Sequence, residues 1–70
     1  MNDNTDIGRN IATYRVLNRL TQARLAEIVG ISKGYLAAIE EGNKIPRIKT
    51  LARIAECLDV ELGALLREMK

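Results

Sequence analysis

Residues 21–40, which read TQARLAEIVGISKGYLAAIE, constrain the fold more than any other part of the chain. The spacing of their apolar residues predicts one short helix, a tight turn and a second short helix. Gly30 is expected to adopt a left-handed conformation that closes the first helix and turns the chain. Ala26 is small enough for the second helix to cross close above it, and Leu36 and Ile39 are expected to anchor that helix to the core. The opposite face of the second helix should therefore point outward.

The rest of the chain also predicts helices. Apolar spacing and polar caps indicate a first helix to about residue 18, a fourth over 48–58 and a short fifth over about 61–69. Thr5 or Asp6 is expected to cap the first helix, Thr21 the second, and Ser32 the third, which ends at Glu41. Glycine and proline mark residues 42–47 as a loop. Because no stretch alternates strictly between apolar and polar residues, we expect an all-α fold of five helices in a single domain, residues 1–70.

Composition limits both the core and the possible chemistry. Seventy residues are close to the smallest size at which a single core suffices, and a chain with two tyrosines but no Phe or Trp must build an aliphatic core. Cys57 is the only cysteine and there is no histidine, which excludes an intrachain disulfide and the usual zinc sites. Cys57 is expected to be a small packing residue, with redox sensing as the alternative. The first ten residues contain no apolar run, so we expect neither a signal peptide nor a membrane anchor, and a cytoplasmic location.

The distribution of charge is more informative than the net charge of +2. Residues 33–53 contain five basic and two acidic side chains, whereas residues 54–70 contain two basic and four acidic ones. An anionic partner would be attracted to the first of these regions and not to the second. An ordinary mixed-charge surface is the alternative interpretation.

Four segments of the sequence resemble the Cro/C1-type helix-turn-helix family, also called xenobiotic-response-element-like. They read IGRNIATYR, LTQARLAEIVGIS, YLAAIEEGNKIP and LARIAECLDVELGALL, and the resemblance covers roughly residues 7–66. It implies a compact, five-helix, lambda-repressor-like domain with its motif at residues 21–41. Such a domain binds double-stranded operator DNA, usually as a dimer, and regulates transcription. The pattern requires no cofactor and no metal.

The resemblance assigns base reading to the start of the third helix, at Lys33 and Gly34. Lys33 can donate to guanine O6 or N7, with a phosphate contact or a solvated charge as the alternative. Gly34, Ala37 and Ala38 replace the long polar side chains of other family members, so direct readout should be sparse. Contact with thymine methyl groups and recognition of DNA shape would then contribute. Tyr35 could place its hydroxyl toward a phosphate or could simply cover the core.

Contacts to the DNA backbone are expected on both sides of the third helix. In the family, the glutamine that follows the second helix cap clamps a phosphate, and this position is Gln22. Lys44, Arg47 and Lys49 surround the single proline, and Arg47 matches a position that can enter the minor groove in relatives. A solvated basic loop is the alternative. The predicted DNA-binding residues are Thr21, Gln22, Ser32, Lys33, Gly34, Tyr35, Ala37, Ala38, Lys44, Arg47 and Lys49.

Two further sets of residues are expected to be structural. Arg15 and Glu40 match a family ion pair that joins the first and third helices. The end of the chain is more apolar than a fifth helix needs for its own packing, which indicates a dimer interface; closure of the monomer core is the alternative. A two-fold dimer would place two third helices about 34 Å apart, facing successive turns of a palindrome. The predicted interface residues are Val60, Leu62, Leu65, Leu66 and Met69.

Some positions depart from the family pattern. Arg19, rather than the frequent glycine, ends the first helix, and Arg47 and Glu61 replace the usual short caps of the fourth and fifth helices. Those two helices are therefore expected to fray.

The predicted function is a sequence-specific transcriptional regulator, acting as a dimeric repressor on a palindromic operator. The alternative is an antitoxin or other interaction module that uses the same fold, with a toxin or polymerase as its protein partner. An enzyme is not expected, because there is no histidine, no nucleophile with an adjacent base, no phosphate-cradling glycine loop and no metal-binding cluster.

Overall fold

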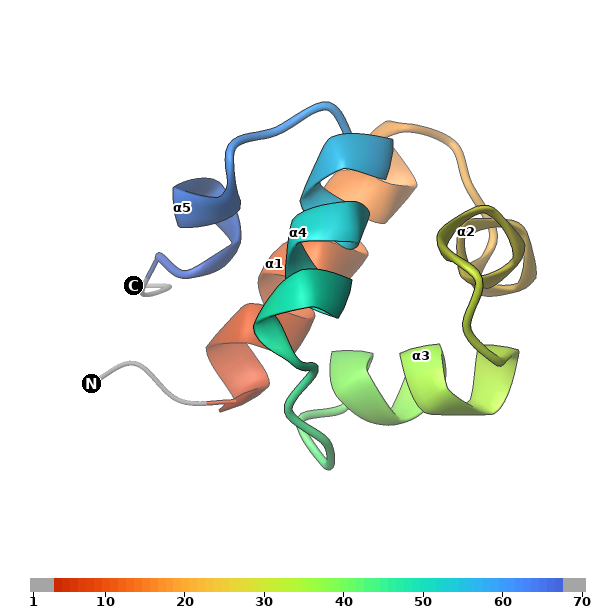
Figure 1. Cartoon of the computed structure of the whole chain (residues 1–70), viewed down its shortest axis with the longest axis horizontal. Coiled ribbons are helices and arrows are strands. Elements are labelled where there is room, and N and C mark those ends of the chain that lie inside the picture. The colour runs from red at the N-terminus through yellow and green to blue at the C-terminus, as the bar shows by residue number, and fades with distance from the viewer. Residues whose placement is uncertain (1–3, 68–70) are drawn as a thin grey trace.

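Five helices account for most of the chain in the computed structural model, which describes residues 4–67 (Figure 1). No strand is present in that range. The all-α prediction and the number of helices are therefore confirmed for this part of the chain. The helices are α1 (Asn4–Leu17), α2 (Gln22–Val29), α3 (Lys33–Glu40), α4 (Ile48–Cys57) and α5 (Leu62–Leu65).

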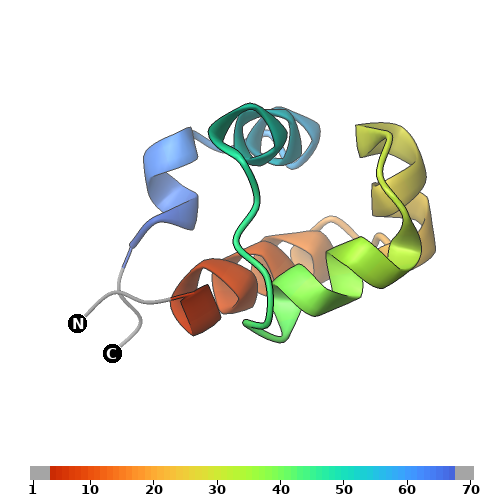
Figure 2. The same ribbon diagram turned by 60° about the horizontal axis from the view of Figure 1, so that its bottom comes forward.

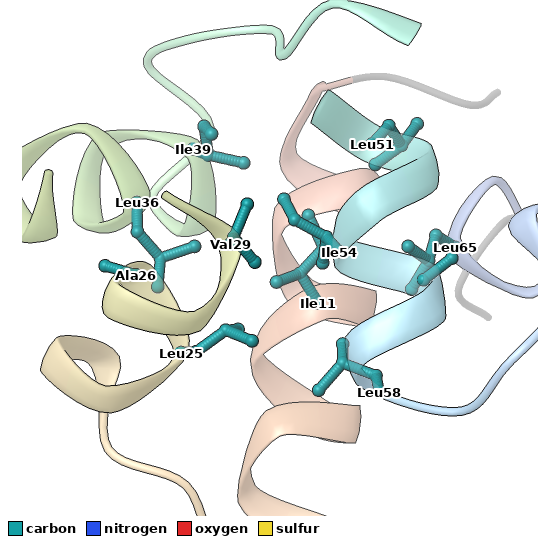
Figure 3. Packing of buried hydrophobic residues seen from close by; sticks show 11 residues of the cluster. Ile11, Leu25, Ala26, Val29, Leu36, Ile39, Leu51, Ile54, Leu58 and Leu65 are labelled. Atoms are coloured by element: carbon teal, nitrogen blue, oxygen red, sulfur yellow. The ribbon is translucent and has the colours of Figure 1, made fainter. Parts of the chain in front are cut away.

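The helices surround a single aliphatic core. Figure 2 shows α1 and α3 along one side of the molecule, α4 on the opposite side, and α2 and α5 at the two ends. Side chains from all five helices meet between them (Figure 3). Each fully buried Leu or Ile contributes about 1.5–3 kcal/mol through the apolar surface removed from water. The buried apolar residues are Ile11, Leu25, Ala26, Val29, Leu36, Ile39, Leu51, Ile54, Ala55, Leu58 and Leu65.

Helices α1 and α3 lie in close contact at Gly8, which is buried. A Cβ atom built on Gly8 would overlap the carbonyl oxygen of Ile39 and would lie 2.6 Å from that of Glu40. Only a residue without a side chain therefore allows α1 to lie against the end of α3. The sequence did not predict this role for Gly8, because the need for a glycine arises from a helix that is distant in sequence.

The start of α1 differs from the prediction. The helix begins at Asn4, so Thr5 and Asp6 lie inside its first turn and neither is the residue that precedes it. Asp6 is buried there, and a carboxylate in the first turn of a helix is favoured by the helix dipole.

The fifth helix is much shorter than predicted, because it ends at Leu65 rather than near residue 69. The side-chain amide of Asn10, which is buried on α1, donates to the carbonyl oxygens of Leu65 at 2.9 Å and Arg67 at 2.8 Å. These carbonyls bond to α1 instead of continuing a helical ladder. The predicted interface residue Met69 lies outside the described residues.

Candidate nucleic-acid interface

Local hydrogen bonds fix the relative placement of α2 and α3. The Thr21 hydroxyl accepts from the backbone N–H of Arg24 at 3.0 Å, and the Ser32 hydroxyl accepts from that of Tyr35, also at 3.0 Å. Between the helices, Gly30 has a φ of 89° and donates its N–H to the carbonyl of Ala26 at 2.8 Å. The caps and the left-handed glycine therefore stand where the sequence predicts them. The hydroxyl groups of Thr21 and Ser32, both predicted to be DNA-binding residues, act as caps in this structure.

One face of α3 is buried and the opposite face lies at the edge of the molecule. Leu36 and Ile39 are fully buried, whereas Lys33 and Gly34 at the start of the helix are exposed. Figures 1 and 2 show no other helix beyond the outer side of α3. A Cβ atom at Gly34 would meet no heavy atom within 4 Å, so the fold itself does not require a glycine there. The first turn of α3 thus has an accessible outer surface on which Lys33 carries a long side chain and Gly34 carries none.

The other predicted residues of α3 are less exposed. Ala37 and Ala38 are half-buried, and each can present only a methyl group. Tyr35 is also half-buried and packs against the core, which is the second of the two interpretations that the sequence allowed. Among the predicted base-reading residues on α3, only Lys33 has a side chain that can donate a hydrogen bond.

A polar cluster lies between α1, α2 and α3. Arg15 and Glu40, the expected structural pair, lie with Arg15 Nε 2.7 Å from Glu40 Oε2, and their side chains are only 15% and 6% exposed. Gln22 joins this pair, because its Nε2 donates to Glu40 Oε1 at 3.0 Å. The predicted phosphate ligand is therefore already bonded within the protein, a contact that the sequence did not indicate.

The loop between α3 and α4 presents an exposed basic surface. Lys44, Arg47 and Lys49 are exposed, and a hollow at the start of α4 is lined by Arg47 and Lys49 together with Thr50, Ala52 and Arg53. Arg47 precedes the helix without making a side-chain cap, so the first N–H groups of α4 have no side-chain acceptor from that residue. Arg53 is not among the DNA-binding residues predicted from the sequence. Its spacing of four from Lys49, which places both on one helix face, could have identified it.

The predicted dimer residues do not form one exposed surface. Leu65 is fully buried in the core, so its inclusion in the interface was wrong, and the alternative that it closes the monomer core applies. Val60 and Leu62 are half-buried and pack against that core. Leu66 is 38% exposed. Within residues 4–67, the most exposed large apolar side chain is that of Leu17 at the end of α1, with 70% of its surface accessible, and the sequence did not predict it.

Cys57 is half-buried and packs against the core, in agreement with its predicted packing role. Burial raises the pKa of its thiol, Glu56 raises it further, and Arg53 acts in the opposite direction. Separately, no helix within residues 4–67 is long and apolar enough to cross a membrane.

Two capped helices joined by a left-handed glycine, with an open outer face and a basic loop beside it, define a helix-turn-helix domain. A model of the helix-turn-helix family HTH_3 matches residues 11–65, and the chain belongs to this family.

Several known proteins resemble the chain over most of its length. It is 37% identical over 65 residues to the ImmF control region 10 kDa protein of Bacillus phage phi105, covering 93% of this chain and 72% of that protein. It is 32% identical over 60 residues to control protein C.SmaI of Serratia marcescens, covering 86% and 71% respectively. Among solved structures, SinR, the master regulator for biofilm formation, in complex with DNA, matches with a TM-score of 0.83 at 35% identity. The match covers 87% of this chain and 98% of the chain in that structure. These matches confirm the fold and the family.

Proposed function

We propose that this chain is a sequence-specific regulator of transcription that binds double-stranded DNA through the outer face of α3. The observation that carries the proposal is the exposed outer surface at the first turn of α3, together with the basic loop that follows the other end of this helix (Figure 1). An α-helix fits the major groove of B-DNA, and its first residues reach the base edges. The solved structure of SinR with DNA, which matches nearly this whole chain, supports the same assignment.

Base reading would depend on few atoms. Lys33 can donate to guanine, whereas Gly34, Ala37 and Ala38 offer only backbone or methyl groups. A helix with small residues at these three positions can lie deep in the groove and place the alanine methyl groups against thymine methyls. The remaining specificity would then come from the shape and deformability of the DNA.

Phosphate contacts would flank the groove on both sides. The first N–H groups of α2 and α4 lack partners within their own helices, and helix N-termini favour anions. Gln22 stands at the first of these helix ends. At the second, Arg47, Lys49 and Arg53 line the hollow, and Lys44 lies in the preceding loop.

The chain would act as a homodimer that represses transcription from a palindromic operator. Its location would be the cytoplasm. The relatives include the immunity repressor of Bacillus phage phi105, which is 36% identical over 62 residues, although this chain spans only 43% of that repressor. The exposed part of the region after α4, namely Leu66 with the half-buried Val60 and Leu62, is the surface we assign to the dimer. We assign the chain no enzymatic role, because the curated relatives include an immunity repressor, a control protein and an HTH-type transcriptional regulator.

A protein-interaction role is the second candidate. A shallow hollow on α1 is lined by Ala12, Thr13, Val16 and Leu17, and the last two are among the most exposed apolar side chains. Exposed apolar surface of this kind is typical of a protein contact. Co-purification of a stoichiometric partner that Leu17→Asp abolishes would support this role, whether the partner is a toxin or a polymerase.

Selection from a randomised duplex pool at two salt concentrations tests the proposal. We expect a palindrome to be enriched and affinity to fall steeply with salt, because bound phosphates release counterions. Lys33→Ala should relax preference at particular bases, whereas Lys44→Ala should weaken all sequences about equally and flatten the salt slope by roughly one unit.

Glu56→Gln serves as the control, because it changes one charge in the last turn of α4, remote from α3 (Figure 1). It should leave preference and slope unchanged. Full affinity and unaltered preference in both lysine variants would show that the DNA-binding surface lies elsewhere.

A further inference from the structure

Three side chains from separate helices meet where α2 begins. Arg15 comes from α1, Gln22 is the first residue of α2, and Glu40 is the last residue of α3. Arg15 donates from Nε to Glu40 Oε2 at 2.7 Å and from Nη2 to Glu40 Oε1 at 3.1 Å. Its Nη1 also donates to the carbonyl of Leu20 at 2.8 Å, immediately before the residue that caps α2.

Glu40 is thereby held at both oxygens. Its side chain is only 6% exposed, and a paired Arg–carboxylate fork has a defined geometry. The remaining contact is the one from Gln22 Nε2 to Glu40 Oε1, at 3.0 Å. Gln22 therefore bonds to a group that cannot easily move, so its own side chain is ordered before any ligand binds.

We propose that Glu40 is a positioning residue for DNA binding: held by Arg15, it fixes the Gln22 side chain at the start of α2 for contact with a phosphate. This inference rests on the proposed function. A glutamine amide has two N–H groups, so one can bond to Glu40 while the other remains for a phosphate oxygen. It would act together with the backbone N–H groups of the first turn of α2, which have no partner within the helix.

The energetic reason is preorganisation. A flexible glutamine must lose rotamer freedom when it binds a phosphate, and this loss weakens binding. Because Glu40 orders Gln22 in the free protein, the rotamer entropy of this side chain is lost during folding and not during DNA binding. If the ion pair were only structural, Glu40 would hold α1 against α3 and would not influence what Gln22 does at the DNA.

The first test measures the order of Gln22 directly, without substitution. Gln22 is the only glutamine in the chain, so its side-chain amide gives the only glutamine NH2 signal in the NMR spectrum. We expect its order parameter in the free protein to approach the roughly 0.85 of rigid backbone. Asn43 provides an internal reference for an exposed amide, because its Nδ2 donates only over 3.4 Å to Glu41, which is itself exposed. A Gln22 value below about 0.6, in the range of flexible groups, would overturn the proposal.

The second test is a double-mutant cycle on affinity for the duplex selected from the randomised pool. Glu40→Ala should weaken binding roughly two- to tenfold when Gln22 is present, the range expected for immobilising one side chain. In the Gln22→Ala background the same substitution should cause no further loss. Equal losses in both backgrounds would show a purely structural role and overturn the proposal.

Controls separate positioning from instability. Affinities are corrected for the folded fraction, measured by circular dichroism at the same temperature. Glu27→Ala removes an exposed carboxylate that pairs with Arg24 on α2, and it should leave affinity unchanged. Glu40→Gln keeps an acceptor oxygen for Gln22 and should recover most of the affinity. If the Glu40 variants do not fold, the NMR measurement decides alone.

The outcomes distinguish this inference from the proposed function. If the wild-type chain binds no duplex, the proposed function fails and the inference fails with it. If the wild-type chain binds but Gln22 is mobile, or the cycle shows equal losses, only the role of Glu40 is overturned.

Discussion

At the scale of single residues, the absence of a side chain has opposite meanings at two glycines. Gly8 lies against the backbone carbonyls of Ile39 and Glu40, so a methyl group there would force α1 away from α3. Gly34 has open space around its Cβ position and lies in a helix, where glycine is unfavourable relative to alanine. The first glycine is needed for packing, whereas the second has no structural reason within the fold.

We expect Gly8→Ala to lower the free energy of unfolding by about 2–3 kcal/mol, the upper part of the range for overpacking, because the neighbours of the new methyl group are backbone atoms that cannot rotate away. Gly34→Ala is the control and should raise it by up to about 1 kcal/mol through helix propensity. Urea unfolding measures both. Equal midpoints for the two variants would show that α1 does not pack against α3 in this way.

Cys57 provides a residue-scale prediction on pH. Burial and Glu56 raise the pKa of its thiol, so less thiolate is present near neutral pH than for an ordinary cysteine. Alkylation by iodoacetamide at pH 8 should therefore be slower in the folded protein than in urea, and the difference should shrink as the pH rises through the raised pKa. Identical rates in both states would contradict this assignment.

At the scale of elements, the first four helices end in the same way. Each is followed by a residue in the left-handed region, and the next N–H bonds to a carbonyl five residues earlier, as in Leu20 to Arg15 at 3.1 Å and Ile31 to Ala26 at 3.0 Å. This is the Schellman arrangement. The left-handed residues are Arg19 (φ 59°), Gly30 (φ 89°), Gly42 (φ 85°) and Asp59 (φ 58°).

Two of these four positions carry a side chain that strains the backbone. A left-handed conformation costs a non-glycine residue roughly 1–2 kcal/mol. Glycine loses more entropy on folding, so we expect Arg19→Gly and Asp59→Gly each to stabilise the protein by about 0.5–1 kcal/mol. The midpoint temperature of thermal unfolding, Tm, should then rise by a few degrees, since about 1 kcal/mol corresponds to roughly 4–8 °C in a domain of this size. Gly30→Ala should shift it in the opposite direction; a rise in that variant would contradict the argument.

The elements that the sequence predicted correctly are those whose signals are local. Caps at Thr21 and Ser32 and the turn at Gly30 depend on neighbours within a few residues, so α2 and α3 appear with nearly their predicted bounds. The end of α5 depends on Asn10, 55 residues away from its partner Leu65, and no local pattern contains that contact. The same applies within the candidate site: helix placement followed from sequence, whereas the hydrogen bond from Gln22 to Glu40 required the fold.

At the scale of the whole molecule, the fold brings together groups that are separate in the chain. Gln22 at the start of α2 bonds to Glu40 at the end of α3, and the basic loop joins that same end of α3 to the start of α4. The starts of α2 and α4 both favour anions. The acidic residues after position 54 belong to the far end of α4 and the segment that follows it. A modest net charge is thus compatible with one basic face, and we expect the proposed DNA binding to weaken strongly as salt is added.

The proposed dimer gives a prediction about operator geometry. If two copies associate through the surface that includes Leu66, two half-sites centred about 10–10.5 base pairs apart should bind cooperatively. Leu66→Asp should then weaken binding to the full palindrome at least about tenfold. Placing a charge in an apolar contact costs more than about 1.4 kcal/mol, which corresponds to a factor of ten in affinity. Affinity for an isolated half-site should be unaffected.

Leu17→Asp is the matched control, because Leu17 is more exposed than Leu66 and lies on α1 rather than after α5. Analytical ultracentrifugation with and without DNA measures association directly, and inserting five base pairs between the half-sites should abolish cooperativity by placing them on opposite sides of the duplex. If Leu17→Asp weakens the full site and Leu66→Asp does not, then the two copies associate through α1. The exposed hollow on α1 would then be the dimer surface. The segment after α4 would serve only to close the core, in which its residue Leu65 is fully buried.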